Sequence, residues 1–264
     1  MTDFPNRKVW LVGAGPGDPE LLTRKAERLI RAATVIFYDA LVGPGILDLA
    51  HPEARRVQVG KRAGRHSKAQ VEIDRMIVAA ALSGERVVRL KGGDPSIFGR
   101  ATEEISACRD AGVDVSICPG VTAASAAAAG LGGSLTLRGL ARKLVFVTAH
   151  ARASEALDLD WQALADPQAT LAIYMGKAAA GEVSRELVAA GLPFDTPVAL
   201  VENASLPSER HMRTRLDLLP LAAKAGLGGG PALLLIGQAL EAARPEPQSK
   251  DSCSAHHRNL QEAE

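Results

Sequence analysis

The sequence predicts an α/β fold with two α/β domains and mostly parallel sheets. Short apolar runs alternate with amphipathic segments along the chain, which is typical of parallel strands joined by helices. Hydrophobic residues make up 47% of the 264 residues, which is enough for a sizeable core. A Pro-Gly turn at 119–120 separates two such series. We therefore expect domains at 1–118 and 119–243, with a ligand cleft between them.

The first domain is expected to contain five strands, each a short and mostly apolar run. These runs lie at 9–12, 35–38, 56–59, 86–90 and 113–117. Between them, apolar residues recur at helical spacing at 21–30, 44–50, 71–82 and about 95–111. Because helices separate the strands, we expect parallel pairing through crossover connections.

The second domain shows the same alternation. Strands are expected at 144–148, 170–174, 197–201 and 232–236, an edge strand at 209–215, and helices at 122–129 and 178–190. From residue 244 onward Pro, Ser, Gln, Lys and Glu dominate, and these residues supply little apolar surface for a core. We therefore expect a mobile tail at 244–264.

Two glycine turns connect a strand to a helix in the same way. Gly92-Gly93-Asp94-Pro95 follows the strand at 86–90, and residues 13–19, Gly-Ala-Gly-Pro-Gly-Asp-Pro, follow the strand at 9–12. Glycine permits positive φ and close backbone approach, and Asp-Pro is typical of a helix N-cap and first helical position. Such turns are where open α/β sheets bind ligands. Paired glycines flanked by charged residues favour a ligand site at 92–94 over a simple tight turn.

The first glycine turn partly matches the dinucleotide-binding fingerprint Gly-x-Gly-x-x-Gly. Gly13 and Gly15 occupy the first two glycine positions, but Asp18 stands at the third. A carboxylate there would repel a pyrophosphate at the helix N-terminus, and Pro16 removes an amide donor. Asp39 does follow the next strand, where a ribose-binding acid would lie. Because the phosphate-binding part is incomplete, we do not expect a nicotinamide site.

Charge and composition exclude several classes of protein. The formal net charge is +1 and aromatic residues make up 3% of the chain, so a general nucleic-acid binder is not expected. No apolar run approaches membrane-spanning length and residues 1–7 do not resemble a signal peptide, so we expect no membrane association. Three widely spaced cysteines favour a reducing compartment, and we expect a cytoplasmic protein. Cys253, His256 and His257 lack a fourth ligand, so no metal site is expected.

One segment concentrates positive charge. Between Glu53 and Glu72 there are six Lys or Arg residues and no acidic residue, in a chain of nearly balanced charge. Such a segment can attract an anionic ligand, or it can simply be a solvated loop. The sequence favours neither interpretation over the other.

Several separate motifs resemble those of the tetrapyrrole methylase family, and most closely those of members that methylate uroporphyrinogen III. The motifs lie between about residues 9 and 238 and occur in the family's order. They are Val12-Gly13-Ala14-Gly15-Pro16-Gly17-Asp18-Pro19, Tyr38-Asp39-Ala40-Leu41-Val42, Gly60-Lys61-Arg62 with Gly64-Arg65-His66-Ser67, the stretch at 89–100, Pro119-Gly120-Val121-Thr122-Ala123, Tyr174-Met175-Gly176 and Val201-Glu202-Asn203. Each motif alone is moderate evidence, and their common order makes the resemblance specific.

The resemblance implies the tetrapyrrole methylase fold, with the active site in a trough between the two α/β domains, and usually a homodimer. It implies S-adenosyl-L-methionine as methyl donor, S-adenosylhomocysteine as its product, and no metal. The implied substrate is uroporphyrinogen III, methylated at C-2 and C-7 to give precorrin-2 via precorrin-1 for sirohaem, cobalamin or haem d1 synthesis. The family's donor contacts map onto Pro16, Gly92, Gly93, Asp94, Ile97, Thr122, Ala123, Met175, Ala204 and Ala232.

The resemblance also assigns catalytic and substrate-binding positions. The family's proton-handling residues map onto Asp39 and Lys61. Arg100, Glu103 and Arg138 match positions associated with the substrate, and we assign Arg100 to catalysis through substrate orientation. Because the substrate is a polycarboxylate, Arg62 and Arg65 of the basic segment are expected to bind it as well.

The chain departs from the family at residues 133–138, where Gly-Ser-Leu-Thr-Leu-Arg replaces Ile-Pro-Leu-Thr-His-Arg. Two other functions stay open. One is methylation at another ring carbon by a corrinoid-pathway methyltransferase, and the other is a module that binds S-adenosylmethionine without catalysis. The segment 61–67 and Phe98-Gly99-Arg100 favour the uroporphyrinogen activity.

Overall fold

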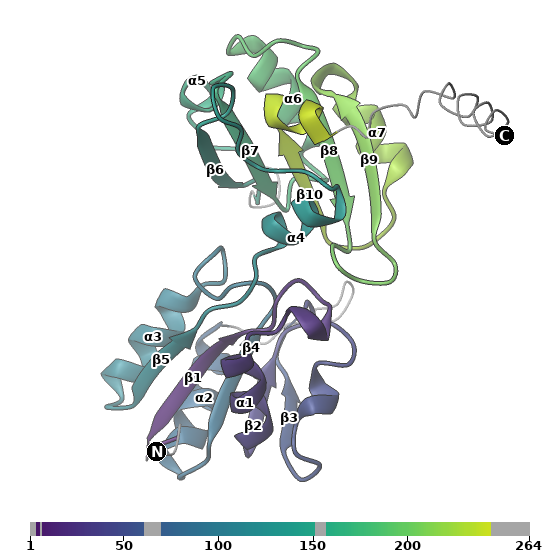
Figure 1. Cartoon of the computed structure of the whole chain (residues 1–264). Coiled ribbons are helices and arrows are strands. Elements are labelled where there is room, and N and C mark those ends of the chain that lie inside the picture. Colours follow the sequence, from purple (N-terminus) through teal and green to yellow (C-terminus); the bar gives the residue numbers. More distant parts are fainter. Residues whose placement is uncertain (1–3, 6, 61–69, 151–156, 244–264) are drawn as a thin grey trace, which may run out of the picture.

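The computed structural model describes residues 4–5, 7–60, 70–150 and 157–243, and the structural statements below concern these residues. The chain forms two lobes, each built around its own five-stranded sheet (Figure 1). Strands β1–β5 form the first sheet, strands β6–β10 form the second, and residues 119–122 join the two. The predicted α/β class is thereby confirmed.

The first sheet is entirely parallel, as predicted, with strand order β3-β2-β4-β1-β5. Its strands are β1 (Lys8–Gly13), β2 (Val35–Tyr38), β3 (Arg55–Gln58), β4 (Val87–Lys91) and β5 (Asp114–Cys118). Its helices are η1 (Pro19–Leu21), α1 (Arg24–Ala32), η2 (Leu47–Leu49), α2 (Gln70–Leu82) and α3 (Ala101–Asp110). The segment expected to be helical at 44–50 contains only the single 3₁₀ turn η2.

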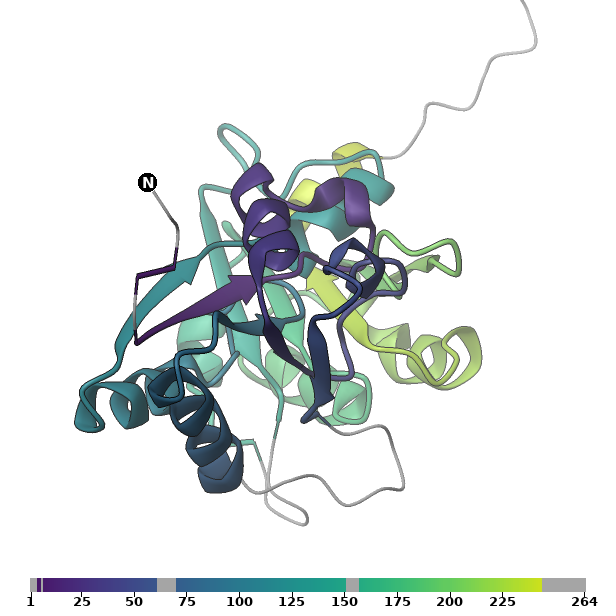
Figure 2. The same cartoon turned by 90° about the horizontal axis from the view of Figure 1, so that it is seen from below.

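Both faces of this sheet are buried, because side chains alternate along each strand. On β1, Trp10 and Val12 pack with α1 and η2, whereas Val9 and Leu11 pack with α2 and α3. Figure 2 shows α1 on one side of the sheet and α2 with α3 on the other. Strand β4 therefore lies in the middle of a sheet that is covered on both faces.

The second sheet is mixed, with strand order β6-β7-β10-β8-β9. Its strands are β6 (Lys143–Thr148), β7 (Ala169–Tyr174), β8 (Pro197–Glu202), β9 (Arg210–Arg215) and β10 (Ala232–Ile236), and β9 is the predicted edge strand. Only β6 and β7 pair in parallel, so the expectation of mostly parallel pairing fails within this sheet.

The connections explain the mixed pairing. The short segment 203–209 between β8 and β9 is too short for a crossover helix, so β9 must run antiparallel to β8. A helical connection then leads from β9 to β10, which gives β10 the direction of β9. Inserted between β7 and β8, β10 is therefore antiparallel to both neighbours.

Helices cover both faces of the second sheet as well. One face packs against α5 (Trp161–Leu164), α6 (Ala180–Ala189) and α7 (Leu219–Gly226), and the other against α4 (Ala123–Gly130) and η4 (Gln238–Ala243). Helices α5 and α7 and the 3₁₀ helices η3 (Leu216–Leu218) and η4 were not predicted. Leu21 of the first lobe packs against the cluster around α4.

The predicted helix caps are only partly correct. Asp18 caps the 3₁₀ helix η1, while α1 begins later and is capped by Thr23. Asp94 does not cap α3, because α3 begins at Ala101 and residues 92–100 form a loop. The Asp94 carboxylate instead accepts hydrogen bonds from Ser96 within that loop. The Asp-Pro pattern thus marks a turn at this position and not the start of a helix.

Candidate functional site

Three glycines meet where β1, β4 and β5 end. A Cβ added to Gly13 would lie 2.6 Å from the Gly120 nitrogen and 2.7 Å from the Gly93 carbonyl oxygen. A Cβ added to Gly120 would lie 2.3 Å from the Gly93 carbonyl oxygen. Gly93 also exchanges two backbone hydrogen bonds with Gly15, at 2.7 and 3.2 Å. Only glycine allows such close backbone packing. We call this meeting point the glycine junction.

Gly92 and Gly93, both predicted to contact the donor, have different surroundings. A Cβ on Gly92 would lie 2.7 Å from the Cβ of Leu41, so Gly92 is required for packing. Gly93 has a φ of +68°, and a Cβ there would meet no atom within 4 Å. The backbone at Gly93 is therefore the part of this turn that a ligand can approach closely, which fits a bound donor molecule.

The carboxylate of Asp94 stabilises the glycine junction through hydrogen bonds to two loops. One oxygen of its carboxylate accepts a hydrogen bond from the Gly120 nitrogen at 2.9 Å, and the other accepts from the Ser96 nitrogen at 2.8 Å. Two loops that are far apart in the sequence are thereby tied together. This hydrogen bond gives Asp94 a structural role that does not depend on donor binding.

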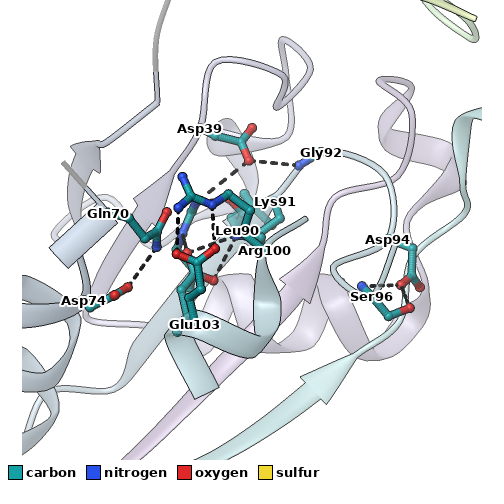
Figure 3. A network of polar contacts seen from close by, with 12 residues as sticks. Asp39, Gln70, Asp74, Leu90, Lys91, Gly92, Asp94, Ser96, Arg100 and Glu103 are labelled. Atoms are coloured by element: carbon teal, nitrogen blue, oxygen red, sulfur yellow. Dashed lines mark hydrogen bonds and ion pairs between the residues drawn. The ribbon is translucent and has the colours of Figure 1, made fainter. Parts of the chain in front are cut away.

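Asp39 lies at the end of β2, beside this junction. Its Oδ1 accepts a hydrogen bond from the Leu41 nitrogen at 3.0 Å. Its Oδ2 accepts a hydrogen bond from the Gly92 nitrogen at 3.4 Å (Figure 3). Its side chain is 21% exposed. The predicted proton acceptor is thus bound to the glycine turn at 92–93 and still partly accessible.

A buried charge cluster lies directly beneath Asp39. Arg89 and Lys91 of β4 both bind Glu104 of α3, with N–O distances of 2.8 and 2.9 Å. Burial lowers the pKa of Lys91, and the positive charge of Arg89 adds to this effect, while Glu104 opposes it. The sequence indicated charged residues beside the two glycines but did not predict a buried ion cluster. The available signal was the presence of two cations within an otherwise apolar strand.

Arg100 and Glu103 form an exposed pair at the start of α3. The guanidinium binds both carboxylate oxygens, at 2.7 and 2.6 Å. The hydrogen bond from Arg100 lowers the pKa of Glu103, and the same bond raises the pKa of Arg100. Arg100 adopts a φ of +55°, which is uncommon for a residue with a side chain. The structure thus pairs two predicted substrate-binding residues beside the 92–100 loop.

Tyr174, at the end of β7, connects the two lobes. Its hydroxyl forms hydrogen bonds with the Thr122 hydroxyl and the Ala124 nitrogen, and its ring lies 5.1 Å from that of Phe98. Burial raises the pKa of Tyr174. Thr122, a predicted donor contact, is the N-cap residue of α4, but its side chain binds Tyr174 instead of capping the helix. Sequence analysis missed Tyr174 and Phe98 as contacts between the domains.

Met175 follows Tyr174 and is 48% exposed, with a φ of +56°. It lines a cavity of about 530 Å³ together with Ala232 and Lys177. Two predicted donor contacts, Met175 and Ala232, thus share one hollow. The lining is mostly apolar and includes the residues 230–232, as is usual for small-molecule sites.

A second contact joins the lobes near Ala204. The Asp18 nitrogen donates a hydrogen bond to the Ser205 hydroxyl at 3.1 Å, and a Cβ on Gly17 would lie 2.5 Å from a side-chain atom of Leu206. Ala204 is buried at this contact, whereas Pro16 is partly exposed in the loop after β1. Both residues were predicted to contact the donor.

The remaining predicted residues are more dispersed. Ile97 is half-buried in the 92–100 loop, and Ala123 begins α4. Arg138 is exposed in the segment between α4 and β6, and no described hydrogen bond or ion pair links it to Asp39 or Arg100. Lys61, Arg62 and Arg65 lie outside the described residues, as does the predicted tail at 244–264.

The described residues contain neither a candidate metal site nor a candidate membrane-spanning helix. No three His, Cys, Asp or Glu side chains lie close enough there to hold a metal ion. No helix in the described ranges combines the length and apolar character needed to cross a membrane.

Solved structures support the fold. A cobalt precorrin-4 methyltransferase superposes with a TM-score of 0.80 and 31% identity over 90% of this chain and 99% of its own. A uroporphyrin-III C-methyl transferase from Thermus thermophilus, crystallised with S-adenyl homocysteine, gives a TM-score of 0.76 and 39% identity over 89% of this chain and 99% of its own.

Curated relatives agree with the structural neighbours. A siroheme synthase from Gluconacetobacter diazotrophicus is 48% identical over 88% of this chain and 49% of its own length. A uroporphyrinogen-III C-methyltransferase from Paracoccus denitrificans is 46% identical over 87% of this chain and 80% of its own. The chain thus spans about half the length of the siroheme synthases it matches. Residues 8–220 match the family described as tetrapyrrole (corrin/porphyrin) methylases, and the chain belongs to that family.

Proposed function

We propose that this chain transfers methyl groups from S-adenosylmethionine to C-2 and C-7 of uroporphyrinogen III, giving precorrin-2 via precorrin-1. The observation that carries the proposal is that the carboxylate of Asp39 accepts a hydrogen bond from the Gly92 nitrogen, directly beside the open backbone at Gly93. The relatives named above as uroporphyrin-III methyltransferases support the choice of substrate.

The donor-binding part is built from both lobes. The residues assigned to it are Pro16, Gly92, Gly93, Asp94, Ile97, Thr122, Ala123, Met175, Ala204 and Ala232. Gly93 fits this role because its backbone is open on the side that a Cβ would occupy, and Met175 and Ala232 line the apolar hollow. When bound, the donor supplies an electrophilic methyl group on a sulfonium. The protein then has to align that methyl with a pyrrole carbon.

The substrate-binding part is cationic. Glu103 orients the Arg100 guanidinium by binding its Nε and Nη2, and we assign the Nη1 side to a carboxylate of the substrate. Arg138 and the basic residues Arg62 and Arg65 add to the attraction for a polycarboxylate. We assign Arg100 to substrate orientation and not to proton abstraction, because a guanidinium stays protonated.

Proton removal is assigned to Asp39. Attack by a pyrrole carbon leaves a cationic ring, and a positioned base assists the later loss of a proton. Asp39 fits this role because its carboxylate is partly exposed and tied to the Gly92 nitrogen. Lys61 is assigned a supporting role in proton handling.

Incubation with uroporphyrinogen III and the donor, followed by mass spectrometry of the product, tests the proposal. A gain of two methyl groups supports it. A different accepted tetrapyrrole would favour the second candidate, a precorrin methyltransferase, which the structural similarity to the cobalt precorrin-4 enzyme suggests. Donor binding without any product would indicate a non-catalytic binding module.

Two further features belong to this proposal. We infer a homodimer from the family resemblance and a cytoplasmic location from the three widely spaced cysteines. The product would enter sirohaem, cobalamin or haem d1 synthesis. Light scattering at micromolar concentration checks the first inference. A mass near 27.6 kDa, that of one chain, would contradict it.

A further inference from the structure

Two cations are buried in the middle of the first sheet. Arg89 and Lys91 stand two residues apart on β4 and therefore point to the same face, where Glu104 of α3 meets them. Their side chains are 6%, 5% and 0% exposed, respectively. Burying charges is unfavourable unless each has a partner, so such a cluster requires a reason beyond packing.

The negative charge of Glu104 alone does not neutralise the two cations. Its Oε1 accepts from the Arg89 Nε at 2.8 Å, and its Oε2 accepts from the Lys91 Nζ at 2.9 Å. One negative charge thus faces two positive charges. The second carboxylate is Asp39, whose Oδ2 lies 3.9 Å from Arg89 Nη1 (Figure 3). The four side chains together form a neutral group.

Arg89 is held rigidly while it faces Asp39. Its Nη1 also donates to the Leu90 carbonyl at 2.8 Å, and its Nε is fixed by Glu104. Asp39, in contrast, is bound by Arg89 and by two backbone amides and keeps part of its surface open. The guanidinium therefore keeps a fixed positive charge 3.9 Å from the Asp39 carboxylate, whereas no ion pair joins Lys91 to that carboxylate among the described residues.

We propose that Arg89 is a positioning residue for the methyl-transfer reaction, which holds the Asp39 carboxylate in its working place, and that Glu104 in turn fixes Arg89. This inference rests on the proposed function, because it gives Arg89 an effect on rate only through Asp39. A purely structural ion cluster would instead affect folding and would act independently of Asp39.

A double-mutant cycle separates the two possibilities. Arg89→Met, Asp39→Asn and the double variant are compared for kcat, KM, donor affinity and thermal unfolding. Arg89→Met leaves Glu104 and Lys91 as a neutral pair, so the fold should persist. If Arg89→Met proves unfolded, Arg89→Lys replaces it in the same cycle.

We expect Arg89→Met to lower kcat by up to about 100-fold, since small misplacements of a reacting group can have effects of this size. Donor affinity should stay within about twofold of wild type. The double variant should be no slower than Asp39→Asn alone. Lys91→Met is the matched control, because it also removes a cation that binds Glu104. Any loss of kcat that it causes should multiply with the loss caused by Asp39→Asn.

The outcomes are distinguishable. If the losses from Arg89→Met and Asp39→Asn multiply in the double variant, Arg89 does not act through Asp39 and the inference is overturned, while the proposed function stands. Wild-type kcat in Arg89→Met would overturn it as well. If Asp39→Asn itself keeps wild-type kcat, the role of Asp39 in the proposed function fails, and this inference fails with it.

Discussion

The ring of Phe98, in the loop after β4, lies 5.1 Å from the ring of Tyr174, at the end of β7. One residue belongs to the first lobe and the other to the second. Phe98 adopts a φ of +52°, and Tyr174 precedes Met175, whose φ is +56°. Positive φ at residues with side chains is unfavourable and is often kept at functional sites. The aromatic pair thus connects the 92–100 loop of one lobe to the residue before Met175 in the other.

This contact predicts a coupling between the lobes and donor binding. Phe98→Ala removes the aromatic pair, which is worth about 0.5–1.5 kcal/mol. We expect the dissociation constant of the donor to rise by up to about tenfold, because the 92–100 loop loses its contact with Tyr174. Isothermal titration calorimetry measures this change.

Phe194→Ala is the control, since Phe194 is also an exposed phenylalanine but its ring contact is with Arg215. Equal donor affinity in Phe98→Ala and wild type would show that the ring pair does not support the donor site.

The open backbone at Gly93 predicts a loss of donor binding on substitution. In Gly93→Val, the branched side chain would occupy the space in which a ligand can approach the turn, so donor binding should be abolished. Calorimetry on the folded variant checks this.

Gly112 offers a matched control, because its φ of +67° and open surroundings repeat the local strain away from the junction. If Gly93→Val and Gly112→Val bound the donor equally well, the assignment of Gly93 to the donor site would have to be withdrawn.

Asp39 and Arg100 should affect turnover and not donor binding. Asp39→Asn removes the proposed base, and we expect a loss of kcat of about 100-fold or more. Arg100→Lys keeps the charge but loses the bidentate geometry seen with Glu103, and should lower kcat while leaving donor affinity unchanged.

Steady-state kinetics and calorimetry on the same preparations test both variants. Arg31→Lys changes a comparable exposed pair, Arg31 with Glu27 on α1, and should keep wild-type kinetics. Either Asp39→Asn or Arg100→Lys with wild-type kcat would reject the role given to that residue.

The basic segment at 55–68 predicts a salt effect that differs between the two reactants. Salt shortens the Debye length from about 10 Å at 0.1 M to about 3 Å at 1 M. Added salt should therefore raise KM for the polycarboxylate substrate more than KM for the donor, and Arg62→Gln with Arg65→Gln should flatten that dependence.

Arg24→Gln with Arg31→Gln on α1 changes the net charge equally and serves as the control. A salt dependence of KM that is the same in wild type and in the Arg62 and Arg65 double variant would identify the segment as a solvated loop.

The buried thiol of Cys108 predicts a pH effect on stability. Burial raises the pKa of this thiol from 9.0 to about 11. The unfolded chain therefore releases the proton first, and the contribution of Cys108 to stability is complete below pH 9 and is lost as pH rises toward 11. The loss amounts to about 1.4 kcal/mol per pH unit in that range.

Denaturant unfolding at several pH values between 8 and 11 measures this contribution. Cys108→Ala should show a shallower decline than wild type, because it lacks the titrating group. Parallel declines in the two proteins would mean that Cys108 has the same pKa in the folded and unfolded chain.

Local sequence patterns were sufficient for most elements. The run Val35–Tyr38 was predicted with its final bounds, and the glycine turns were placed correctly between strands and helices. Strand and turn signals depend on neighbouring residues alone, so they can be read without the fold. The motifs around Gly93 and Asp39 were sufficient to indicate the family for the same reason.

Only the tertiary structure decided what each of those residues faces. It shows that Gly92 is required for packing and that Gly93 is open, that β10 runs antiparallel to its neighbours, and that Asp39 meets Arg89 while Phe98 meets Tyr174. These contacts join residues about 50 or more positions apart, or depend on strand order. They are fixed by sheet register and by the paths of the connections, and no local preference of the chain specifies them.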